Sequence, residues 1–342
     1  MLITAGDQQR LTGGNLYNRY ILEALVRAGW PVRHLVLPDR GFVDALAVLG
    51  AALIEQKTAL VIVDSIALVP AAIQVPGMCR AVGARVLALM HMLPSELMPK
   101  WQRPVMRYLE RRLLSTADAI VAVGPGQRQP LVAAGAASER IKIITPGRDG
   151  VGVPPSDGAE RRGRGFLCVA NWTPNKGVHR VIEALAHLDA QQTVDLVGME
   201  VEPAYARRVH DLIDRHRLND RVRVHGPLYG QRLARLYTEA GVFVLPSLSE
   251  GFGTVYAEAM SFGLPVIACR IGSIPWLVEE GCGLIIPPGD DEALVLAMTA
   301  LATDADLRRR MGAAATLRSH RLPTWQESCY RFCQLVTDLL EH

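Results

Sequence analysis

The stretch 242–260, VFVLPSLSEGFGTVYAEAM, holds the features that decide the fold. The four apolar residues at 242–245 are typical of a buried strand, and a short loop leads from them to Glu250. Glycines at 251 and 253 then precede apolar residues at helical spacing from about Thr254. A strand that passes through a glycine-rich turn into a helix is the repeating unit of a parallel α/β sheet.

The turn between Glu250 and Glu258 has the properties of a diphosphate site. Gly251 and Gly253 permit backbone angles that side chains forbid, and the bare N–H groups of a helix start attract negative charge. We expect Glu258, about one helical turn further on, to accept hydrogen bonds from ribose hydroxyls. Glu250 is suited to sugar hydroxyls. The ordinary alternatives are a helix cap for Glu250 and a solvated helix residue for Glu258.

The same alternation of apolar runs and helical patterns extends along the whole chain and predicts two doubly wound, parallel-sheet domains that face each other across a cleft. Expected strands are 2–5, 32–37, 59–63, 85–90, 119–123 and 142–145, then 166–170, 194–197, 222–225, 242–245, 265–268 and 283–286. Expected helices include 15–28, 105–115, 178–188 and 203–216. Between residues 147 and 165 the periodicity stops, and the Gly, Pro and charged residues there indicate a linker.

Composition narrows the function classes. A length of 342 residues suits two domains, and a net charge of +3 is too small for a dedicated nucleic-acid binder. The six cysteines show no CxxC spacing, and no export signal opens the chain, so we expect a reducing, cytoplasmic location. The apolar stretch 59–78 is interrupted by polar residues and prolines, and we expect a strand, a loop and a short helix there rather than a membrane span.

Several motifs together resemble the signature of family-4 glycosyltransferases of the GT-B fold, over nearly the whole chain. They are Glu250-x7-Glu258 between Pro-Ser and Ala-Met, SFGLPVIA from 261, Asn175-Lys176-Gly177, VRVHGP from 222, GCGLIIPPGD from 281, Trp325, and Gly13-Gly14. The resemblance implies an acceptor-side Rossmann-like domain at 1–148, a linker at 149–164 and a donor domain at 165–322. It also implies that a C-terminal helix at 323–342 packs back on the first domain.

The resemblance further implies a retaining, metal-independent transfer of a hexose-type sugar from a nucleotide-sugar donor, with UDP favoured over GDP. The donor is then a co-substrate, and no separate cofactor is expected. The acceptor would be a hydroxyl of a small molecule, a glycan or a lipid-linked compound. Implied catalytic residues are His91, Lys176 and Glu250; implied donor-binding residues are Gly13, Gly14, Asn171, Lys176, Gly226, Leu228, Glu250, Gly251, Phe252, Gly253, Thr254 and Glu258.

Individual roles follow from the same resemblance. Lys176 would contact the diphosphate, and His91, at the end of a strand, would orient a hydroxyl. In a same-face attack the departing phosphate helps to remove the acceptor proton, so that no protein nucleophile is needed. Without these motifs, Lys176 reads as a surface lysine, His91 as a structural histidine, and Gly13-Gly14 as a simple tight turn.

Three features leave alternatives open. Asn171 stands where related sequences commonly carry an arginine, and Arg10 and Arg148 are candidate substitutes. Asp304-Ala-Asp306 matches a metal-holding pattern but sits at a helix start, where N-capping explains it better, and we expect no metal. The segment 100–114 mixes basic and apolar residues at helical spacing, as in a helix that docks on an anionic membrane or in a solvated helix with one buried face.

Two other functions remain as alternatives to glycosyl transfer. A nucleotide-sugar epimerase of similar fold would change the donor's stereochemistry without any acceptor. A degenerate nucleotide-sugar-binding protein would bind the donor without turnover, an alternative motivated by Asn171.

Overall fold

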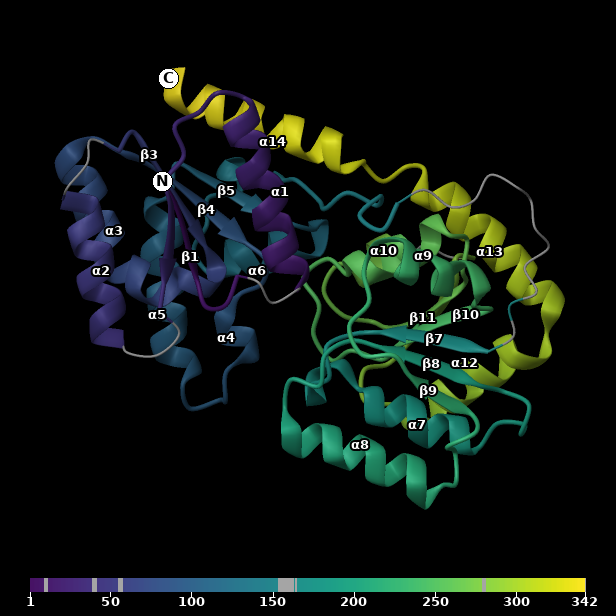
Figure 1. Cartoon of the computed structure of the whole chain (residues 1–342). Helices are drawn as coiled ribbons and strands as arrows, with labels where there is room; N and C mark the ends of the chain where they lie inside the picture. Colours follow the sequence, from purple (N-terminus) through teal and green to yellow (C-terminus); the bar gives the residue numbers. More distant parts are fainter. Residues whose placement is uncertain are drawn as a thin grey trace. The chain divides into compact units, whose positions relative to one another are not determined.

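The computed structural model of the chain describes residues 1–8, 12–38, 42–54, 58–152, 163, 165–278 and 281–341, and all structural statements concern these residues. The chain divides into two compact α/β units (Figure 1). Unit 1 comprises Met1–Pro146 and Trp325–His342, and unit 2 comprises Gly147–Thr324.

Unit 1 is built on a six-stranded parallel sheet with the order β2-β1-β3-β4-β5-β6. The strands are β1 (Leu2–Ala5), β2 (His34–Leu37), β3 (Leu60–Asp64), β4 (Arg85–Met90), β5 (Ala119–Ala122) and β6 (Ile141–Ile143). The central strands β3, β4 and β5 are buried along almost their whole length and are mostly apolar, because helices cover both of their faces.

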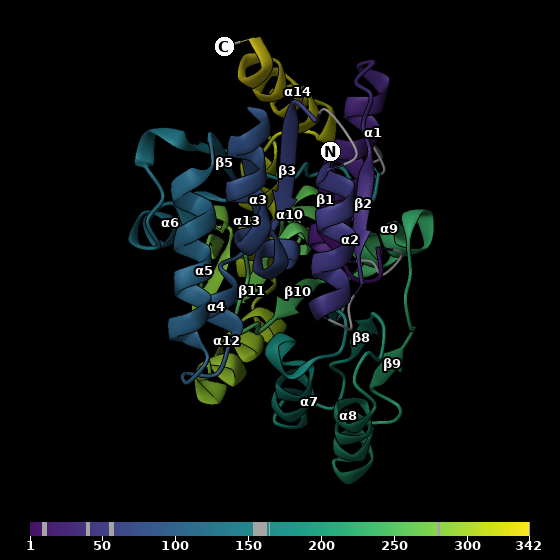
Figure 2. The same cartoon turned by 90° about the vertical axis from the view of Figure 1, so that its left-hand side faces the viewer.

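The helices of unit 1 are α1 (Gly13–Arg27), α2 (Phe42–Ile54), α3 (Leu68–Val82), α4 (Pro94–Leu97), α5 (Arg103–Thr116), α6 (Arg128–Ala133) and α14 (Trp325–Glu341), with short 3₁₀ turns η1 (Ser65–Ala67), η2 (Pro125–Gln127) and η3 (Ser138–Arg140). Crossovers between parallel strands are right-handed. Helix α1 leads from β1 toward β2, in the direction opposite to the later crossovers, and therefore lies on the other face of the sheet from α2, α3 and α5 (Figure 2).

The prediction of a loop and a short helix after β3 is wrong. The turn η1 runs directly into the 15-residue helix α3, although Pro76 lies inside it. Pro76 has no N–H to donate to the Ala72 carbonyl. The Nε of Arg112, on α5, donates to that carbonyl instead, over 2.7 Å. A side chain of the neighbouring helix α5 thus supplies the hydrogen bond that Pro76 cannot donate to the Ala72 carbonyl.

By length and composition the continuous helix Ser65–Val82 is apolar enough to cross a membrane. Half of this window is buried inside unit 1, however, and Leu68, Ala71 and Val75 are fully buried. It is therefore packed as a core helix of unit 1.

Helix α14, at the C-terminal end of the chain, belongs to unit 1, as predicted (Figure 1). The Trp325 ring stacks on Tyr20 of α1, with ring centroids 4.0 Å apart. The hydroxyl of Ser328 donates to the Thr145 carbonyl over 2.7 Å. Helix α14 therefore packs into unit 1, to which the N-terminal residues of the chain also belong.

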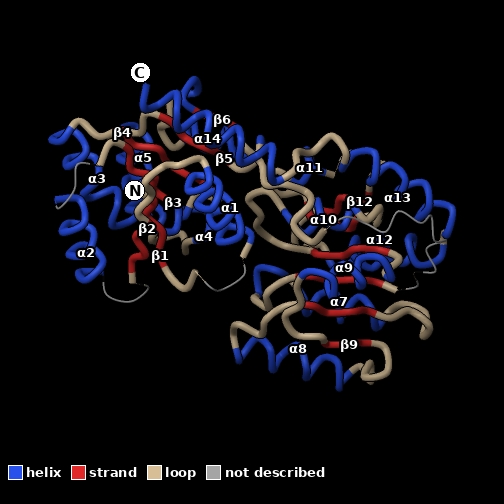
Figure 3. Tube along the Cα trace, turned by 45° about the horizontal axis from the view of Figure 1, so that its top comes forward, coloured by secondary structure: helices blue, strands red, loops and turns tan. Residues whose placement is uncertain are grey.

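Unit 2 holds a second six-stranded parallel sheet, of order β12-β11-β10-β7-β8-β9 (strands in red in Figure 3). Its strands are β7 (Phe166–Val169), β8 (Val194–Val197), β9 (Val222–Val224), β10 (Val242–Leu245), β11 (Val266–Cys269) and β12 (Gly283–Ile286). Its helices are α7 (Val178–Ala186), α8 (Pro203–Arg215), α9 (Gly230–Glu239), α10 (Thr254–Ser261), α11 (Ile274–Leu277), α12 (Asp291–Thr303) and α13 (Ala305–Ser319), with the 3₁₀ turn η4 (Pro174–Lys176).

All twelve predicted strands are present, which confirms the α/β prediction. The predicted strand 32–37 begins only at His34, which pairs with Leu2 at the start of β1. Helix α1 begins at Gly13 rather than near 15, because the Thr12 hydroxyl accepts a hydrogen bond from the amide of Asn15 and caps the helix. Most of the predicted linker 149–164 lies outside the described residues.

Candidate functional site

The first part of the site is the turn around Lys176, in unit 2. Lys176 ends η4, and Gly177, with φ of +70°, turns the chain into α7. A Cβ on Gly177 would lie 2.8 Å from the Pro246 carbonyl oxygen, so only glycine permits this close approach to the loop after β10. The amide of Leu248 donates to the Asn175 carbonyl over 2.8 Å and fastens the two loops together.

This packing brings Lys176 to Glu250, 74 positions further along the chain. The Lys176 ammonium lies 2.6 Å from Glu250 Oε1, and the Ser247 hydroxyl donates to the same oxygen over 2.8 Å. The Lys176 side chain is 28% exposed and that of Glu250 only 10%. The ammonium is therefore fixed in position by a carboxylate while part of its surface stays open to an anion.

The start of α10 adjoins Glu250. Gly253 precedes the helix with φ of +93°, and a Cβ there would lie 2.7 Å from the Tyr256 ring, so this position requires glycine. Gly251 does not have positive φ. Among the described residues, the amides of Thr254 and Val255 make no hydrogen bond. These two donors are available to a ligand at the helix start.

Glu258 is buried inside unit 2, and its interpretation as a solvated helix residue is wrong. The Tyr237 hydroxyl donates to Glu258 Oε2 over 3.2 Å. Burial raises the pKa of Glu258 from 4.5 to about 7, although the hydrogen bond from Tyr237 opposes this rise. Its predicted contact with ribose stays a prediction.

Asn171, Gly226 and Leu228 lie on loops that follow neighbouring strands of unit 2. Asn171 Oδ1 accepts the amide of Met199 over 3.2 Å, which ties the loop after β7 to the loop after β8. The Gly226 carbonyl accepts the amide of Gly198 over 2.9 Å, which ties in the loop after β9. Leu228 lines a cavity of about 610 Å³ with residues of β8, β9 and α9.

Arg10 and Arg148 were the two candidates to supply the positive charge that Asn171 lacks. Arg10 lies outside the described residues. The Arg148 guanidinium donates to the Leu322 carbonyl. A third arginine, Arg180 of α7, was missed from the sequence; its Nε lies 2.5 Å from Asp291, and its guanidinium is buried. An arginine on a predicted helix is ordinarily solvent-exposed, and the partner Asp291 lies 111 positions further along the chain, so the sequence gave no signal of this burial.

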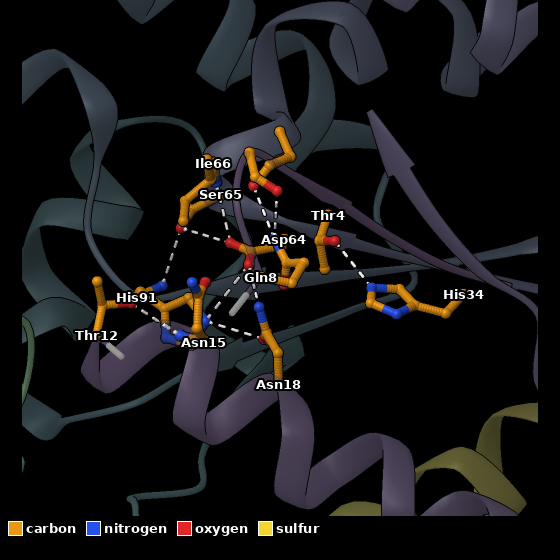
Figure 4. Close-up of polar contacts among 12 residues, drawn as sticks. Thr4, Gln8, Thr12, Asn15, Asn18, His34, Asp64, Ser65, Ile66 and His91 are labelled. Atoms are coloured by element: carbon orange, nitrogen blue, oxygen red, sulfur yellow. Dashed lines mark hydrogen bonds and ion pairs between the residues drawn. The ribbon is translucent and has the colours of Figure 1, made fainter. Parts of the chain in front are cut away.

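In unit 1 the predicted residue His91 follows β4 and sits in a network of polar side chains (Figure 4). His91 Nε2 lies 3.2 Å from Asn18 Oδ1 and 3.7 Å from Asp64 Oδ2. The Asn18 amide also donates to Asp64 Oδ2. Asp64, at the end of β3, is fully buried, and its other oxygen accepts the amide of Ile66 over 2.9 Å.

This network assigns the tautomer of His91. An ionised carboxylate only accepts hydrogen bonds, so the contact with Asp64 fixes the orientation of the Asn18 amide and turns its oxygen toward His91. His91 Nε2 therefore carries the proton, and Nδ1 is the acceptor. Burial lowers the pKa of His91 and so favours the neutral ring, although the carboxylate of Asp64 opposes this shift. Neutral His91 can accept a hydrogen bond from a hydroxyl at Nδ1.

Gly14 explains how α1 reaches this network. A Cβ on Gly14 would lie 3.3 Å from His91 Cδ2, a tight contact that glycine avoids. Asn18 and Asp64 were not among the predicted site residues. Sequence signals existed for both, because Asn18 lies one helical turn after Gly14 and Asp64 ends an apolar strand.

The Asp304 motif caps a helix, as predicted. Asp304 Oδ1 accepts the amide of Leu307 over 2.8 Å at the start of α13. Within the described part of the chain, no group of three or more His, Cys, Asp or Glu side chains is arranged to hold a metal ion.

Comparison with known sequences places both halves of the chain in glycosyltransferase families. Residues 156–318 match the model of "Glycosyl transferases group 1", and residues 25–147 match that of the "Glycosyl transferase 4-like domain". The chain belongs to the family-4-like glycosyltransferases of the GT-B fold.

Individual relatives of this glycosyltransferase cover part of its length. It is 32% identical to a D-inositol 3-phosphate glycosyltransferase of Xylanimonas cellulosilytica, over 64% of this chain and 56% of the relative. It is 29% identical to the sulfoquinovosyl transferase SQD2 of Arabidopsis thaliana, over 64% of this chain and 43% of the relative. The chain thus spans about half the length of these curated relatives.

Solved structures confirm the GT-B fold. Sucrose-phosphate synthase from Thermosynechococcus elongatus matches with a TM-score of 0.82 at 21% identity, over 99% of both chains. Anabaena HepE, in a complex with UDP-glucose, matches with a TM-score of 0.80 at 20% identity, over 98% of this chain and 99% of that one. At these identities the likeness concerns the fold.

Proposed function

We propose that this glycosyltransferase moves a hexose-type sugar from a nucleotide-diphosphate donor to a hydroxyl group, with retention of configuration and without a metal ion. The observation that carries the proposal is the Lys176 ammonium, held 2.6 Å from Glu250 beside the start of α10. The departing diphosphate gathers negative charge as the glycosidic bond breaks. A fixed ammonium and the open amides of Thr254 and Val255 would stabilise that charge.

The other residues take roles around this diphosphate. Glu250 would accept hydrogen bonds from hydroxyls of the transferred sugar, and Glu258 from ribose hydroxyls. The remaining predicted donor contacts are Gly13, Gly14, Asn171, Gly226, Leu228 and the residues of the glycine turn at 251–254.

The reaction we infer needs no covalent intermediate. The bond between the anomeric carbon and the phosphate oxygen breaks, and the acceptor oxygen forms its bond on the same face of the sugar. The acceptor's proton passes to the departing phosphate oxygen. Neutral His91 would orient a hydroxyl through Nδ1, because its Nε2 proton is engaged with Asn18.

We infer a UDP-linked donor ahead of a GDP-linked one. Anabaena HepE, a neighbour in fold, is solved with UDP and with UDP-glucose. One relative is named as a D-inositol 3-phosphate glycosyltransferase, which supports a small phosphorylated hydroxyl compound as the acceptor.

A donor screen tests the proposal. The full chain is incubated with UDP- and GDP-linked hexoses and a mixture of acceptors in the presence of EDTA, and products are identified by mass spectrometry and NMR. We expect transfer from a UDP-hexose with the anomeric configuration of the donor. Inversion, or loss of turnover in EDTA, would contradict the mechanism.

The same screen separates the alternatives. A changed donor without any acceptor would indicate an epimerase, and donor binding without turnover would indicate a degenerate binding protein. Lys176→Met should abolish turnover, whereas Lys142→Met, at an exposed lysine of β6, should leave it unchanged. Full activity of the Lys176 variant would remove the diphosphate assignment.

We also propose a cytoplasmic location, because the six cysteines show no CxxC spacing and lie mostly inside apolar runs, where buried thiols are common in a reducing compartment. Fractionation of cells that express the chain, followed by immunoblotting, tests this. Recovery from an oxidising compartment would contradict it.

A further inference from the structure

Four exposed apolar side chains lie on α4, on α5 and in the turn between these two helices of unit 1, which are labelled in Figure 2. We call this set the docking face; it consists of Leu97, Trp101, Val105 and Tyr108, whose exposed fractions are 58%, 77%, 67% and 64%. Val105 and Tyr108 are three residues apart on α5 and so lie on the same side of it, and Trp101 belongs to the turn just before this helix. This is an unusual amount of exposed aromatic and aliphatic surface for one short segment.

The opposite side of α5 already has its packing partners. Met106, Leu113 and Leu114 are buried in the core of unit 1. Glu110 Oε1 accepts the amide of Ser95 over 2.7 Å and holds α4 against α5. The residues of the docking face are therefore not required for packing of the core, and α4 and α5 hold them at the surface in a fixed arrangement.

Positive charge borders the docking face. Lys100, Arg107 and Arg111 are exposed, and none of them takes part in an ion pair among the described residues. Of the two acidic residues between 94 and 116, Glu110 is buried and only Glu96 is exposed. The surface thus combines apolar and aromatic groups with exposed cations that outnumber the exposed carboxylates.

This combination matches the chemistry of an anionic bilayer surface. Tryptophan and tyrosine favour the boundary between lipid headgroups and acyl chains, because their rings are apolar and their N–H and O–H groups are polar. Arginine and lysine pair with anionic headgroups. We propose that the docking face, with Lys100, Arg107 and Arg111, binds unit 1 to an anionic membrane. The proposal goes beyond the proposed function, because it does not depend on the donor chemistry.

Flotation with vesicles tests the proposal in the absence of any nucleotide sugar. The full chain is mixed with vesicles of phosphatidylcholine alone or of equal parts phosphatidylcholine and phosphatidylglycerol. We expect binding only to the anionic vesicles, weakened by high salt because screening acts on exposed charges. Each basic residue near such a surface strengthens binding by about fivefold, so Arg107→Gln with Arg111→Gln should weaken it by roughly 25-fold.

Matched variants distinguish binding through the docking face from nonspecific adsorption of the protein to vesicles. Trp101→Ala with Tyr108→Ala should weaken binding at least tenfold, whereas Tyr330→Ala, at an exposed tyrosine of α14, should not. Arg207→Gln with Arg215→Gln, on exposed α8, is the charge control. Circular dichroism and thermal unfolding verify that each variant is folded.

Three results would overturn the proposal: no flotation of the unaltered chain with anionic vesicles, equal losses in the control variants, or a dimer in solution that Trp101→Ala dissociates. The last result would show that a second copy covers the docking face. Because no donor is present, failure here leaves the proposed transferase activity untouched, and failure of the donor screen leaves vesicle binding untouched.

Discussion

At the scale of single residues, the pair Lys176–Glu250 is asymmetric, since Glu250 is far more buried than Lys176. Removing the ammonium leaves a buried carboxylate without its cation, whereas removing the carboxylate leaves an ammonium that water can reach. We expect Lys176→Met to lower the free energy of unfolding by about 1–3 kcal/mol and Glu250→Gln by less. The double variant should be more stable than Lys176→Met alone. Urea unfolding of the four proteins measures this, and equal losses in the two single variants would contradict it.

Glu258 gives a prediction that depends on pH. Because its pKa is raised from 4.5 to about 7, the folded protein retains a proton that the unfolded chain has lost across this window. Stability therefore falls as pH rises from 4.5 to 7, and stays lower above it. Glu258→Gln removes this penalty. We expect the variant to gain up to about 3 kcal/mol at pH 8 and little at pH 5, measured by urea unfolding. A gain that is the same at both pH values would rule out titration of Glu258 as its cause.

A second measurement on the same variant concerns the proposed ribose contact. An ionised Glu258 accepts hydrogen bonds better than a protonated one. Binding of UDP-glucose, whose diphosphate does not titrate near neutral pH, should therefore strengthen several-fold between pH 6 and 8. Calorimetry should show no such rise for Glu258→Gln, and a rise that persists in the variant would assign the effect to another group.

At the scale of elements, α3 tolerates Pro76 because Arg112 supplies the donor that the proline lacks. Arg112→Gln should destabilise the protein by about 1 kcal/mol, since this bond is only partly shielded from water. In a Pro76→Ala background the helix recovers its own N–H donor for the Ala72 carbonyl, and the same change should cost less. A double-mutant cycle by chemical denaturation measures the coupling. Zero coupling would show that the two helices are independent at this point.

Helix α3 also shows which features of the fold could not be predicted from the sequence. Strands such as Val242–Leu245 were found with correct ends, because buried parallel strands are short apolar runs bounded by turn residues. Pro70 and Pro76 suggested a broken helix, and the compensating arginine is 36 positions away, where no local pattern connects it to Pro76. Long-range pairing decides such cases.

In the candidate site, too, some residues could be predicted from the sequence and others could not. Lys176 and Glu250 were recognisable because each lies in a motif with a glycine turn, and the structure brings them together. Asn18 and Asp64 act on His91 from two other elements, and a lone polar residue on a helix or at a strand end gives only a weak signal. The burial of Glu258 depends on Tyr237 of α9, which helical spacing alone does not reveal.

At the scale of the whole molecule, the chain returns to unit 1 after it has completed unit 2, and Trp325 is the first residue of that return. Trp325 is nearly fully buried against Tyr20, so Trp325→Ala should remove about 3–5 kcal/mol from the stability of unit 1. Hydrogen exchange followed by mass spectrometry should then show faster exchange in α1, α14 and β6. Exchange in α10 of unit 2 should not change. Tyr330→Ala, on the exposed side of the same helix, is the control and should leave both units as they are. If exchange rose equally in both units, the last helix would stabilise the chain as one cooperative body rather than unit 1 alone.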